Sequence, residues 1–320
     1  MNARIIGTGW CLPAFRADND YLATLVDTSD EWIRERTGIR ARHLAGEETT
    51  VSMAAEAAEK ALARAGREAS EVELLIVATI TGGTDTPSAA CRVQAQIGAK
   101  KAVAFDVNAA CSGFLYALHM ADAFIKSGMY KNALLIGAES LSRIVDWTDR
   151  STCVLFGDGA GAAYVEASES GGLLAQSVGS SGDKWEVLSC RSRSGANPIS
   201  GAQPAGYLTM DGQEVFKFAV RTVPRCIGEA LEGAGVRADE VKLFLLHQAN
   251  LRILQAVAKR LEQPEEKFPM NLDECGNTSA ASLPILMAQL DEAGTLKRGD
   301  LLALSGFGAG LTWGACVLEW

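Results

Sequence analysis

Residues 61–74 read ALARAGREASEVEL, and residues 230–243, 169 positions further along, read ALEGAGVRADEVKL. Eight of the fourteen aligned positions are identical, and the alignment needs no gap. Each copy is typical of the end of a helix, a short loop and an apolar strand, which we expect at residues 74–80 and 243–246. Self-similarity at a fixed distance predicts an internal duplication.

The duplication continues at a nearly constant offset. Strand 102–107 and the helix that begins at Cys111 match a predicted strand at 268–272 and a helix that begins near Asn277, and strand 133–137 matches strand 301–306. Strands that alternate with helices predict an α/β protein with parallel or mixed sheets covered by helices. We expect two halves, residues 1–170 and 171–320, related by approximate twofold symmetry that brings equivalent strand-to-helix turns together.

The composition is that of a globular protein, with 320 residues, 48% hydrophobic and 22% charged. A net charge of −9 and the lack of any Lys/Arg-rich run argue against nucleic-acid binding. Residues 301–318 carry no charge, but four glycines divide them. A strand, a glycine turn and a second strand are therefore favoured there over a membrane span.

The eight cysteines are scattered and form no C-x-x-C pair. This pattern favours reduced thiols in a cytoplasmic protein over a disulfide framework, and it offers zinc no cluster of ligands. We therefore expect no metal site. The N-terminus enters a strand-like segment directly and lacks the apolar core of a signal peptide.

Cys111 is the strongest candidate for a nucleophile because it lies between an apolar strand and an apolar helix. A thiol at a helix N-terminus is near the positive end of the helix dipole, which favours the thiolate. Its neighbours Ala109, Ala110, Ser112 and Gly113 are small and leave room for a substrate. The alternative is a buried structural cysteine, which is a common role for a free cysteine.

His247 and Asn277 lie in two further strand-to-helix turns. His247 ends the apolar strand of the second copy, where α/β proteins place functional side chains, although a packed core histidine would fit as well. Asn277 lies in the turn that matches the Cys111 turn across the repeat, although a helix N-cap would also explain an asparagine there. Of the other histidines, His43 is expected to be exposed and His119 to be packed.

A glycine-rich segment, GDGAG at residues 157–161, has the wrong spacing for a dinucleotide-binding loop. It also runs into a strand-like segment instead of a helix. Crowding of the backbone at a tight turn explains these glycines better.

Six motifs, in order along the chain, resemble those of the β-ketoacyl-acyl carrier protein synthase III family, which starts bacterial type II fatty-acid synthesis. They are VDTSDEW (26–32), RTGIR (36–40), DVNAAC (106–111), FGDGAGAA (156–163), HQAN (247–250) and GNTSAAS (276–282). The resemblance covers essentially the whole chain. It implies a thiolase-like fold with two duplicated halves in a layered αβαβα arrangement.

The resemblance also implies a reaction: an acyl-coenzyme A primer condenses with malonyl-acyl carrier protein, giving 3-oxoacyl-acyl carrier protein, coenzyme A and CO2. Cys111 would carry the acyl group. His247 and Asn277 would stabilise the enolate that forms as CO2 leaves, and the backbone N–H groups of Cys111 and Ala309 would bind the oxyanion. Coenzyme A is a substrate here, so no cofactor is implied.

The same resemblance implies binding sites for the two substrates. Trp32 and Arg150 would flank the adenine of coenzyme A. The phosphates and pantetheine would be held by Thr28, Arg36 and Asn250.

Three basic residues on the helix after His247 would dock an acidic carrier protein, although a solvated helix face explains them equally well: Arg252, Lys259 and Arg260. The family also implies a homodimer.

Two positions depart from the pattern of many relatives. Ala309 stands where many have glycine, which keeps a backbone donor but can shift the turn. Thr86 stands where short-chain-specific relatives often carry a bulky aromatic residue. Together with Phe156, Thr86 is expected to line an acyl pocket that admits chains longer than acetyl.

Two other functions stay open at this point. One is an acyltransferase of secondary metabolism that uses the same Cys, His and Asn. The other is a catalytically silent subunit that only binds partners, and the presence of all three residues argues against it. The sequence does not identify the natural acyl primer.

Overall fold

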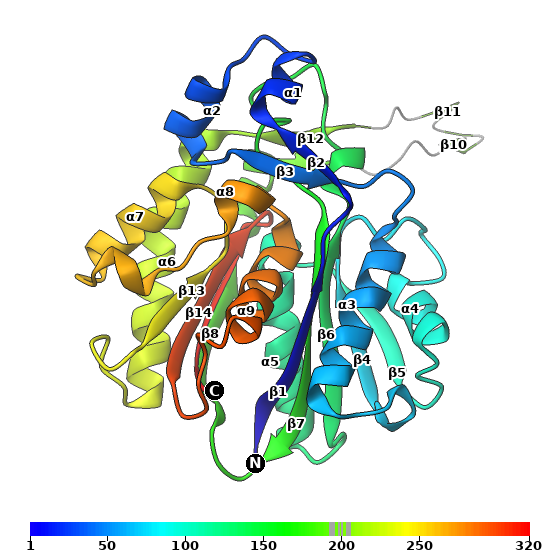
Figure 1. Ribbon diagram of the computed structural model, residues 1–320, viewed down its shortest axis with the longest axis vertical. Coiled ribbons are helices and arrows are strands. Elements are labelled where there is room, and N and C mark those ends of the chain that lie inside the picture. Colours follow the sequence, from blue (N-terminus) through cyan, green and yellow to red (C-terminus); the bar gives the residue numbers. More distant parts are fainter. Residues whose placement is uncertain (192–195, 198, 200, 203–205) are drawn as a thin grey trace.

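The first of two main sheets in the computed structural model is built from the N-terminal half of the chain (Figure 1). The structure describes all residues except 192–195, 198, 200 and 203–205. The strand order is β1-β7-β6-β4-β5. The strands are β1 (Asn2–Cys11), β4 (Leu74–Ala78), β5 (Val103–Val107), β6 (Asn132–Glu139) and β7 (Gly159–Ser168). All five residues of β4, LLIVA, are buried, as expected for a central strand covered on both faces.

The second sheet follows the same plan. Its strand order is β8-β15-β14-β13, from β8 (Gly172–Ser180), β13 (Leu243–Leu246), β14 (Leu301–Gly308) and β15 (Thr312–Glu319). The strands β14 and β15 pair antiparallel across a turn that contains Gly310, so the uncharged segment 301–318 is a hairpin, as predicted.

The repeat seen in the sequence recurs in the backbone. The strands β4 and β13 begin 169 residues apart, as do β6 and β14. Two non-glycine residues with positive φ, Ala110 (47°) and Ser279 (50°), are separated by the same offset and begin the equivalent turns. We propose that residues 1–170 and 171–320 are the two copies of an ancestral unit.

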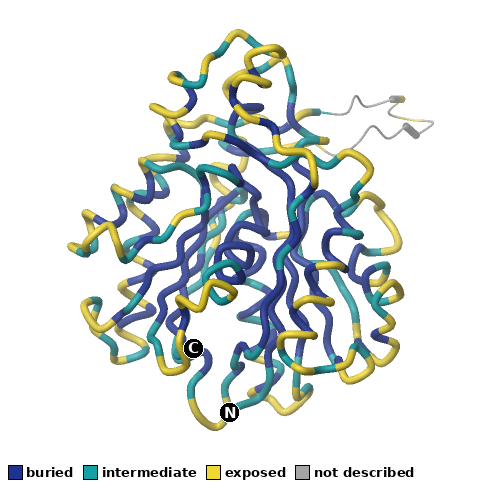
Figure 2. The backbone as a smooth tube through the Cα atoms, viewed as in Figure 1, coloured by how far each residue is buried: buried dark blue, intermediate teal, exposed yellow. Residues whose placement is uncertain are grey.

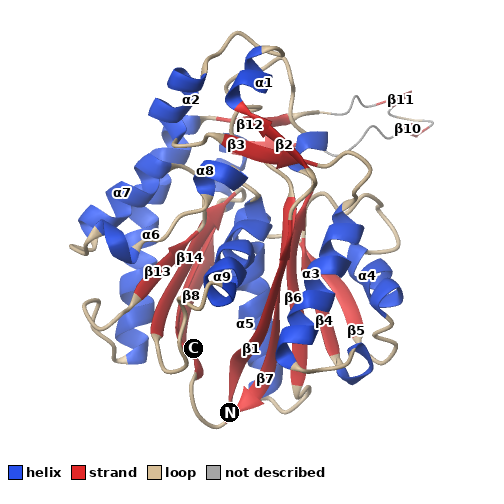
Figure 3. Ribbon diagram, in the orientation of Figure 1, coloured by secondary structure: helices blue, strands red, loops and turns tan. Residues whose placement is uncertain are grey.

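Helices form the other layers (Figures 1 and 3). Two helices, α5 (Gly113–Lys126) and α9 (Ser282–Glu292), lie between the sheets. The helix α5 packs against β1, β4 and β6, and α9 packs against β1 and β7. The outer faces are covered by α3 (Thr50–Ala65) and α4 (Ala89–Ile97) on the first sheet and by α6 (Gly212–Ala234) and α7 (Leu251–Arg260) on the second half. The expected αβαβα layering is therefore present.

The packing explains the alanine-rich sequence of α3. A side chain at Gly7 or Gly9 of β1 would lie within 2.3 Å of a carbonyl oxygen of α3, so helix and strand touch backbone to backbone. Figure 2 shows the result: the sheets and the central helices are buried, and exposure is concentrated in outer helices and loops.

Smaller elements form a cap at one end of the layers (Figure 1). They are β2 (Phe15–Asp18), α1 (Asn19–Ala23), α2 (Asp30–Thr37), β3 (Ala41–Leu44), β9 (Leu188–Cys190), β12 (Leu208–Met210) and α8 (Leu272–Cys275). The short strands β10 (Ala196–Asn197) and β11 (Gly201–Ala202) pair with each other beside it.

The predicted strand at residues 268–272 is wrong. Phe268 instead stacks on Phe244 with ring centroids 4.9 Å apart, and the chain then enters α8. Pro269 has no N–H for a strand ladder, and the N–H of Asn271 donates to the side chain of Gln248. The second sheet consequently has no strand equivalent to β5 of the first sheet.

No helix among the described residues has the length and apolar character that a membrane crossing requires. The described part of the chain also contains no group of three or more His, Cys, Asp or Glu side chains placed to hold a metal ion.

Candidate active site

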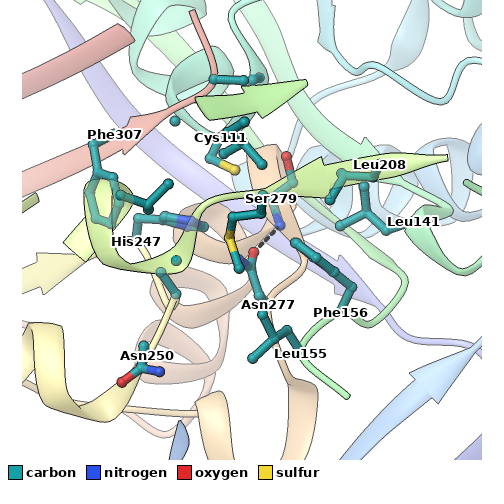
Figure 4. A pocket seen from close by; sticks show the side chains of 18 of the residues that line it. Cys111, Leu141, Leu155, Phe156, Leu208, His247, Asn250, Asn277, Ser279 and Phe307 are labelled. Carbon is teal, nitrogen blue, oxygen red and sulfur yellow. Dashed lines mark hydrogen bonds between the residues drawn. The ribbon is translucent and has the colours of Figure 1, made fainter. Parts of the chain in front are cut away.

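A cavity of about 130 Å³ is lined by residues of both halves of the chain and of the cap strands β9 and β12. Three predicted residues from three separate turns line it together: Cys111, His247 and Asn277 (Figure 4). Most of the remaining lining is apolar: Ile80, Leu141, Leu155, Phe156, Leu188, Leu208, Met210, Val215, Phe216, Ile253 and Phe307. A thiol and two neutral polar side chains thus share a largely apolar space.

Cys111 lies in a short 3-10 turn, Ala110–Ser112, between β5 and α5. It therefore precedes the α-helix instead of opening it, in contrast to the sequence expectation. The pKa of its thiol is raised to about 12, chiefly by burial; the Ser279 hydroxyl opposes this rise and the Glu139 carboxyl adds to it. The thiol is therefore protonated at neutral pH, so acyl transfer requires a group that accepts its proton.

His247 follows β13 and is almost completely buried. Burial lowers the pKa of its imidazole to about 3, so the ring is neutral at physiological pH. The Oγ of Ser282 lies 2.6 Å from His247 Nδ1 and also accepts a long, 3.4 Å hydrogen bond from the N–H of Gln248. We therefore assign the Ser282 hydroxyl proton to Nδ1, which places the ring proton on Nε2.

Asn277 is held by both its backbone and its side chain. Its N–H donates to Leu155 O at 2.9 Å, and its carbonyl accepts from the N–H of Gly157 at 3.0 Å. Its Oδ1 accepts from the N–H of Ser279 at 2.9 Å, the dashed line in Figure 4. Since the carbonyl end of the amide is thereby occupied, the Nδ2 end is the one available to a ligand.

The glycines of the GDGAG segment are explained by this close contact. A side chain on Gly157 would lie 2.3 Å from Cys275 O, in the segment that leads to Asn277. One on Gly161 would lie 2.4 Å from the N of Ile285 in α9. Backbone crowding, as predicted, is therefore why these positions lack side chains.

The strand β14 completes the nucleophile's surroundings. A side chain on Gly308 would lie 2.8 Å from Cys111 N and 2.9 Å from its Cβ. Ala309 follows and lines the cavity beside Cys111. The hydroxyl of Thr312 donates to the carbonyls of Ala309 (3.0 Å) and Ala109 (3.1 Å), which ties the two turns together.

Comparison with known proteins identifies this constellation. A family model described as 3-oxoacyl-[acyl-carrier-protein] synthase III matches residues 105–182, and the model of its C-terminal part matches residues 231–320. A curated relative from Aquifex aeolicus named beta-ketoacyl-[acyl-carrier-protein] synthase III is 49% identical and covers 100% of both chains. The chain belongs to this family.

Further relatives agree with that assignment. A synthase III from Clostridium perfringens is 46% identical over 99% of each chain. The crystal structure of the synthase III from Aquifex aeolicus VF5 superposes with a TM-score of 0.93 at 50% identity, covering 99% of this chain and 100% of that one. The chain therefore has the thiolase-like fold and is a condensing acyltransferase, as the resemblance implied.

A polyketide enzyme is also similar, though less so. The priming β-ketosynthase of the R1128 polyketide pathway is 34% identical with a TM-score of 0.92, covering 99% of this chain and 96% of that one. The higher identity to enzymes named synthase III favours fatty-acid synthesis over secondary metabolism.

The residues that the synthase III resemblance implied for coenzyme A gather outside the cavity. The guanidinium carbons of Arg36 and Arg150 lie 4.5 Å and 5.1 Å from the centroid of the Trp32 ring. Arg150 also donates to Asp27 O at 2.7 Å, and the Thr28 hydroxyl is buried without a hydrogen-bond partner among the described residues. Both guanidinium groups therefore lie against the Trp32 indole.

Asn250 connects this group to the cavity, which it also lines. It caps α7 by accepting from the N–H of Arg252 at 2.8 Å, and its Nδ2 donates to Arg36 O at 3.0 Å. Arg252 in turn donates to Glu35 O. The start of α7 is therefore fixed against α2, so that Trp32 lies near the turn that carries His247.

The predicted basic residues of α7, namely Arg252, Lys259 and Arg260, are exposed. Arg260 lines a surface hollow together with four further basic residues that the sequence analysis did not single out: Lys184, Lys217, Arg221 and Arg225. They come from α6 and from the segment after β8, so only the fold brings them beside α7.

The structure does not bring Thr86 to the cavity. Thr86 lies in an exposed loop before α4, whereas Phe156 lines the cavity as expected. The other two histidines do not line the cavity. His43 Nδ1 lies 2.6 Å from Pro13 O, and His119 lies within α5.

Sequence reasoning missed three polar residues at the site. Ser279 and Ser282 belong to the GNTSAAS motif, but nothing in the motif indicates which side chain faces His247. Glu139 ends β6 and is completely buried behind the cavity. A carboxylate at the end of an otherwise apolar strand, ALLIGAE, was the available signal.

Proposed function

We propose that this synthase III condenses an acyl-coenzyme A primer with malonyl-acyl carrier protein, releasing coenzyme A and CO2 and thereby initiating fatty-acid synthesis. The observation that carries the proposal is the meeting of one thiol with two neutral hydrogen-bonding side chains in an apolar cavity. The chemistry uses thioester substrates and side chains alone, so it needs no cofactor.

In the first half-reaction, Cys111 Sγ attacks the thioester carbonyl of the primer and coenzyme A leaves, giving an acyl-enzyme. The crowded contact of Gly308 with Cys111 supports a fixed position for the sulfur. The backbone N–H groups of Cys111 and Ala309 would stabilise the oxyanion of the tetrahedral intermediate.

In the second half-reaction, malonyl-acyl carrier protein loses CO2 and leaves an enolate. His247 Nε2–H and Asn277 Nδ2–H are the proposed donors to the enolate oxygen. The depressed pKa of His247 supports this role, because a neutral donor adds no fixed charge to the apolar cavity. The enolate carbon then attacks the acyl group on Cys111, which forms the new carbon–carbon bond.

The proposed substrate sites follow the same geometry. The adenine of coenzyme A would insert between Trp32 and Arg150, which now stack directly. The pantetheine would pass Asn250 into the cavity. We propose that Arg252, Lys259 and Arg260, with the basic residues of the neighbouring hollow, dock the acidic carrier protein.

We also propose that the enzyme works as a cytoplasmic homodimer. The strand β5 is an outer strand of the first sheet and pairs with β4 alone, and Val103 on it is 49% exposed. An apolar edge strand invites pairing with a second copy of the chain. All eight cysteines are free, which suits a reducing compartment.

The decisive experiment uses intact-protein mass spectrometry with acetyl-coenzyme A. The wild type should gain one acetyl group, and Cys111→Ala should gain none while keeping its fold. Cys91→Ala, which removes an exposed cysteine elsewhere, is the control and should acetylate normally. An adduct on Cys111→Ala, or none on the wild type, would refute the proposed nucleophile.

A further inference from the structure

A second titratable group lies directly behind the nucleophile, and the reaction just proposed does not use it. Glu139, the last residue of β6, has no exposed surface. Its carboxylate accepts from Thr81 Oγ1 at 2.5 Å, from Thr79 Oγ1 at 3.2 Å and from the N–H of Ile80 at 3.2 Å.

All of these donors are neutral. The residue opposite Glu139 on β7 is Gly159, and the titratable side chain that faces it from the 3-10 turn is Cys111 itself. Burial raises the pKa of Glu139 to about 7, although the hydrogen bonds from Thr81 and its neighbours lower it. The carboxyl therefore changes its protonation state near neutral pH, where a general base is most effective.

The turn Ser279–Ala281 packs against both β6, which ends at Glu139, and the turn that carries Cys111, and Ser279 lines the cavity together with Cys111. Its backbone is held at φ 50°, in the left-handed region that serine seldom adopts, and the residue is 2% exposed. Its buried hydroxyl has no hydrogen-bond partner among the described residues, and it lowers the pKa of both the Cys111 thiol and the Glu139 carboxyl. An unpartnered buried hydroxyl between an acid and a base can pass a proton in either direction.

A separate acceptor for the thiol proton is needed because His247 Nε2 is the proposed hydrogen-bond donor to the enolate. In the tautomer assigned above, the Ser282 hydroxyl donates to Nδ1, so Nε2 carries a proton and has no free lone pair. A ring that donates from Nε2 to the enolate cannot also remove the Cys111 proton from the same nitrogen.

We propose that Glu139 stores the proton of Cys111, relayed by the Ser279 hydroxyl, for as long as the acyl-enzyme exists. The inference rests on the proposed condensation. During acylation the Cys111 S–H bond breaks, the proton passes through Ser279 to the Glu139 carboxylate, and the sulfur forms its bond to the acyl carbon. The thioester bond of the primer breaks, and coenzyme A leaves as a thiolate that takes a proton from water.

During condensation the proton returns. The enolate carbon bonds to the acyl carbon, the bond from that carbon to Cys111 breaks, and the sulfur leaves as a thiolate. Glu139 gives its proton back through Ser279, which restores the thiol and the carboxylate. While the enolate exists, Glu139 is neutral, so no carboxylate charge behind the cavity opposes the developing negative charge.

The test is the pH dependence of single-turnover acylation, with acetyl-coenzyme A as primer and intact mass as readout. In the wild type the acylation rate should fall as the pH drops through about 7, because the Glu139 carboxyl is then already protonated and cannot accept the proton of Cys111. Glu139→Gln, which keeps an acceptor for Ile80, should acylate on the order of 10²-fold more slowly at pH 7.5 and lose this inflection. Ser279→Ala should reproduce both effects.

Asp158→Asn is the matched control, because Asp158 is also fully buried with a raised pKa but is bound to Ser142 and Ala45 and does not line the cavity. It should keep the inflection. A merely structural role of Glu139 would slow acylation but leave the inflection near pH 7, and either that result or a wild-type profile in Glu139→Gln would overturn the proposal. If Glu139→Gln fails to fold, Ser279→Ala decides alone. If the wild type itself forms no acyl-enzyme, the proposed function fails instead.

Discussion

The side chains of the cavity divide into donors that stay neutral and groups that exchange a proton. Ser282 fixes one side of the His247 ring and the N–H of Ser279 fixes Asn277 Oδ1, which leaves His247 Nε2–H and the Nδ2 amide group of Asn277 for a ligand. In the proposed relay, Cys111 and Glu139 are the two groups that exchange a proton. Burial sets both classes, since it keeps the imidazole neutral and moves the carboxyl to near-neutral pH.

The donor roles predict a separation of the two half-reactions. His247→Ala and Asn277→Ala should still form the acyl-enzyme but lose roughly 10²–10³ in the rate of CO2 release from malonyl-acyl carrier protein, the usual cost of deleting such a donor. His119→Ala, a histidine of α5 outside the cavity, is the control and should release CO2 at the wild-type rate. Normal decarboxylation by both cavity variants would contradict the roles assigned here.

Glu139 also predicts how stability depends on pH. Its pKa is raised from 4.5 to about 7 in the folded state, so between these values the folded protein keeps a proton that the unfolded chain has lost. Stability is therefore highest below pH 4.5 as far as this group is concerned, and it falls by about 3 kcal/mol as the pH rises through 7.

Glu139→Gln removes this dependence. The difference in the free energy of unfolding, Glu139→Gln minus wild type, should increase from pH 5 to pH 8. Urea denaturation of both proteins at each pH measures this difference. A difference that is the same at both pH values would mean that Glu139 titrates normally in the folded protein.

At the scale of elements, the site depends on how closely strands and turns approach one another. Gly308 of β14 and Gly157 before β7 each leave room for a backbone segment that carries a functional residue. The crowding at these positions is against backbone atoms, which cannot move aside as the end of a flexible side chain can.

This close approach predicts a contrast between two glycines of β14. An added methyl at Gly308 would lie 2.8 Å from Cys111 N and displace the nucleophile, whereas one at Gly306 would meet its nearest atom, Leu115 Cδ1, at 3.3 Å. Gly308→Ala should slow acylation on the order of 10²-fold, the cost of misplacing a reacting group by about 1 Å. Gly306→Ala is the matched control and should slow it much less; equal losses would argue against a positional effect.

At the scale of the whole molecule, the duplication places the site. The order β1-β7-β6-β4 of the first sheet matches the order β8-β15-β14-β13 of the second. The equivalent turns after β5 and before α9 meet at the cavity. The offset of 169 pairs Asn277 with Asn108 and Cys111 with Ala280. The two copies therefore contribute different residues of equivalent turns: Cys111 comes from the first turn and Asn277 from the second, whereas their counterparts Ala280 and Asn108 do not line the cavity.

The exposed edge of β5 predicts the assembly state. Light scattering after size exclusion should show a dimer for the wild type and a shift towards monomer for Val103→Lys, which places a charge on the edge strand. Met129→Lys, at an apolar residue that is 62% exposed in the loop after α5, is the control and should remain dimeric. A wild-type monomer would refute the proposed dimer.

Local pattern was enough to predict the α/β class, the duplication, the hairpin at 301–318 and three turns with chemically suited residues, because these features depend on periodicity and on neighbours in the chain. It failed at residues 268–272, where Pro269 prevents a strand that hydrophobicity alone suggests. Thr86 is exposed and does not line this cavity in the single chain, so its place in the acyl pocket stays a prediction.

What the tertiary structure alone decided is which distant residues touch. Ser282 meets His247 across 35 positions and Thr81 meets Glu139 across 58, and neither separation follows a helix or strand period. Burial is likewise a property of the assembled fold, so the neutral imidazole, the protonated thiol and the near-neutral pKa of Glu139 could not be derived from residue types. The sequence by itself determined which chemical groups are present; the packing of the two halves determined their protonation and their partners, because both depend on the removal of water from side chains that are far apart along the chain.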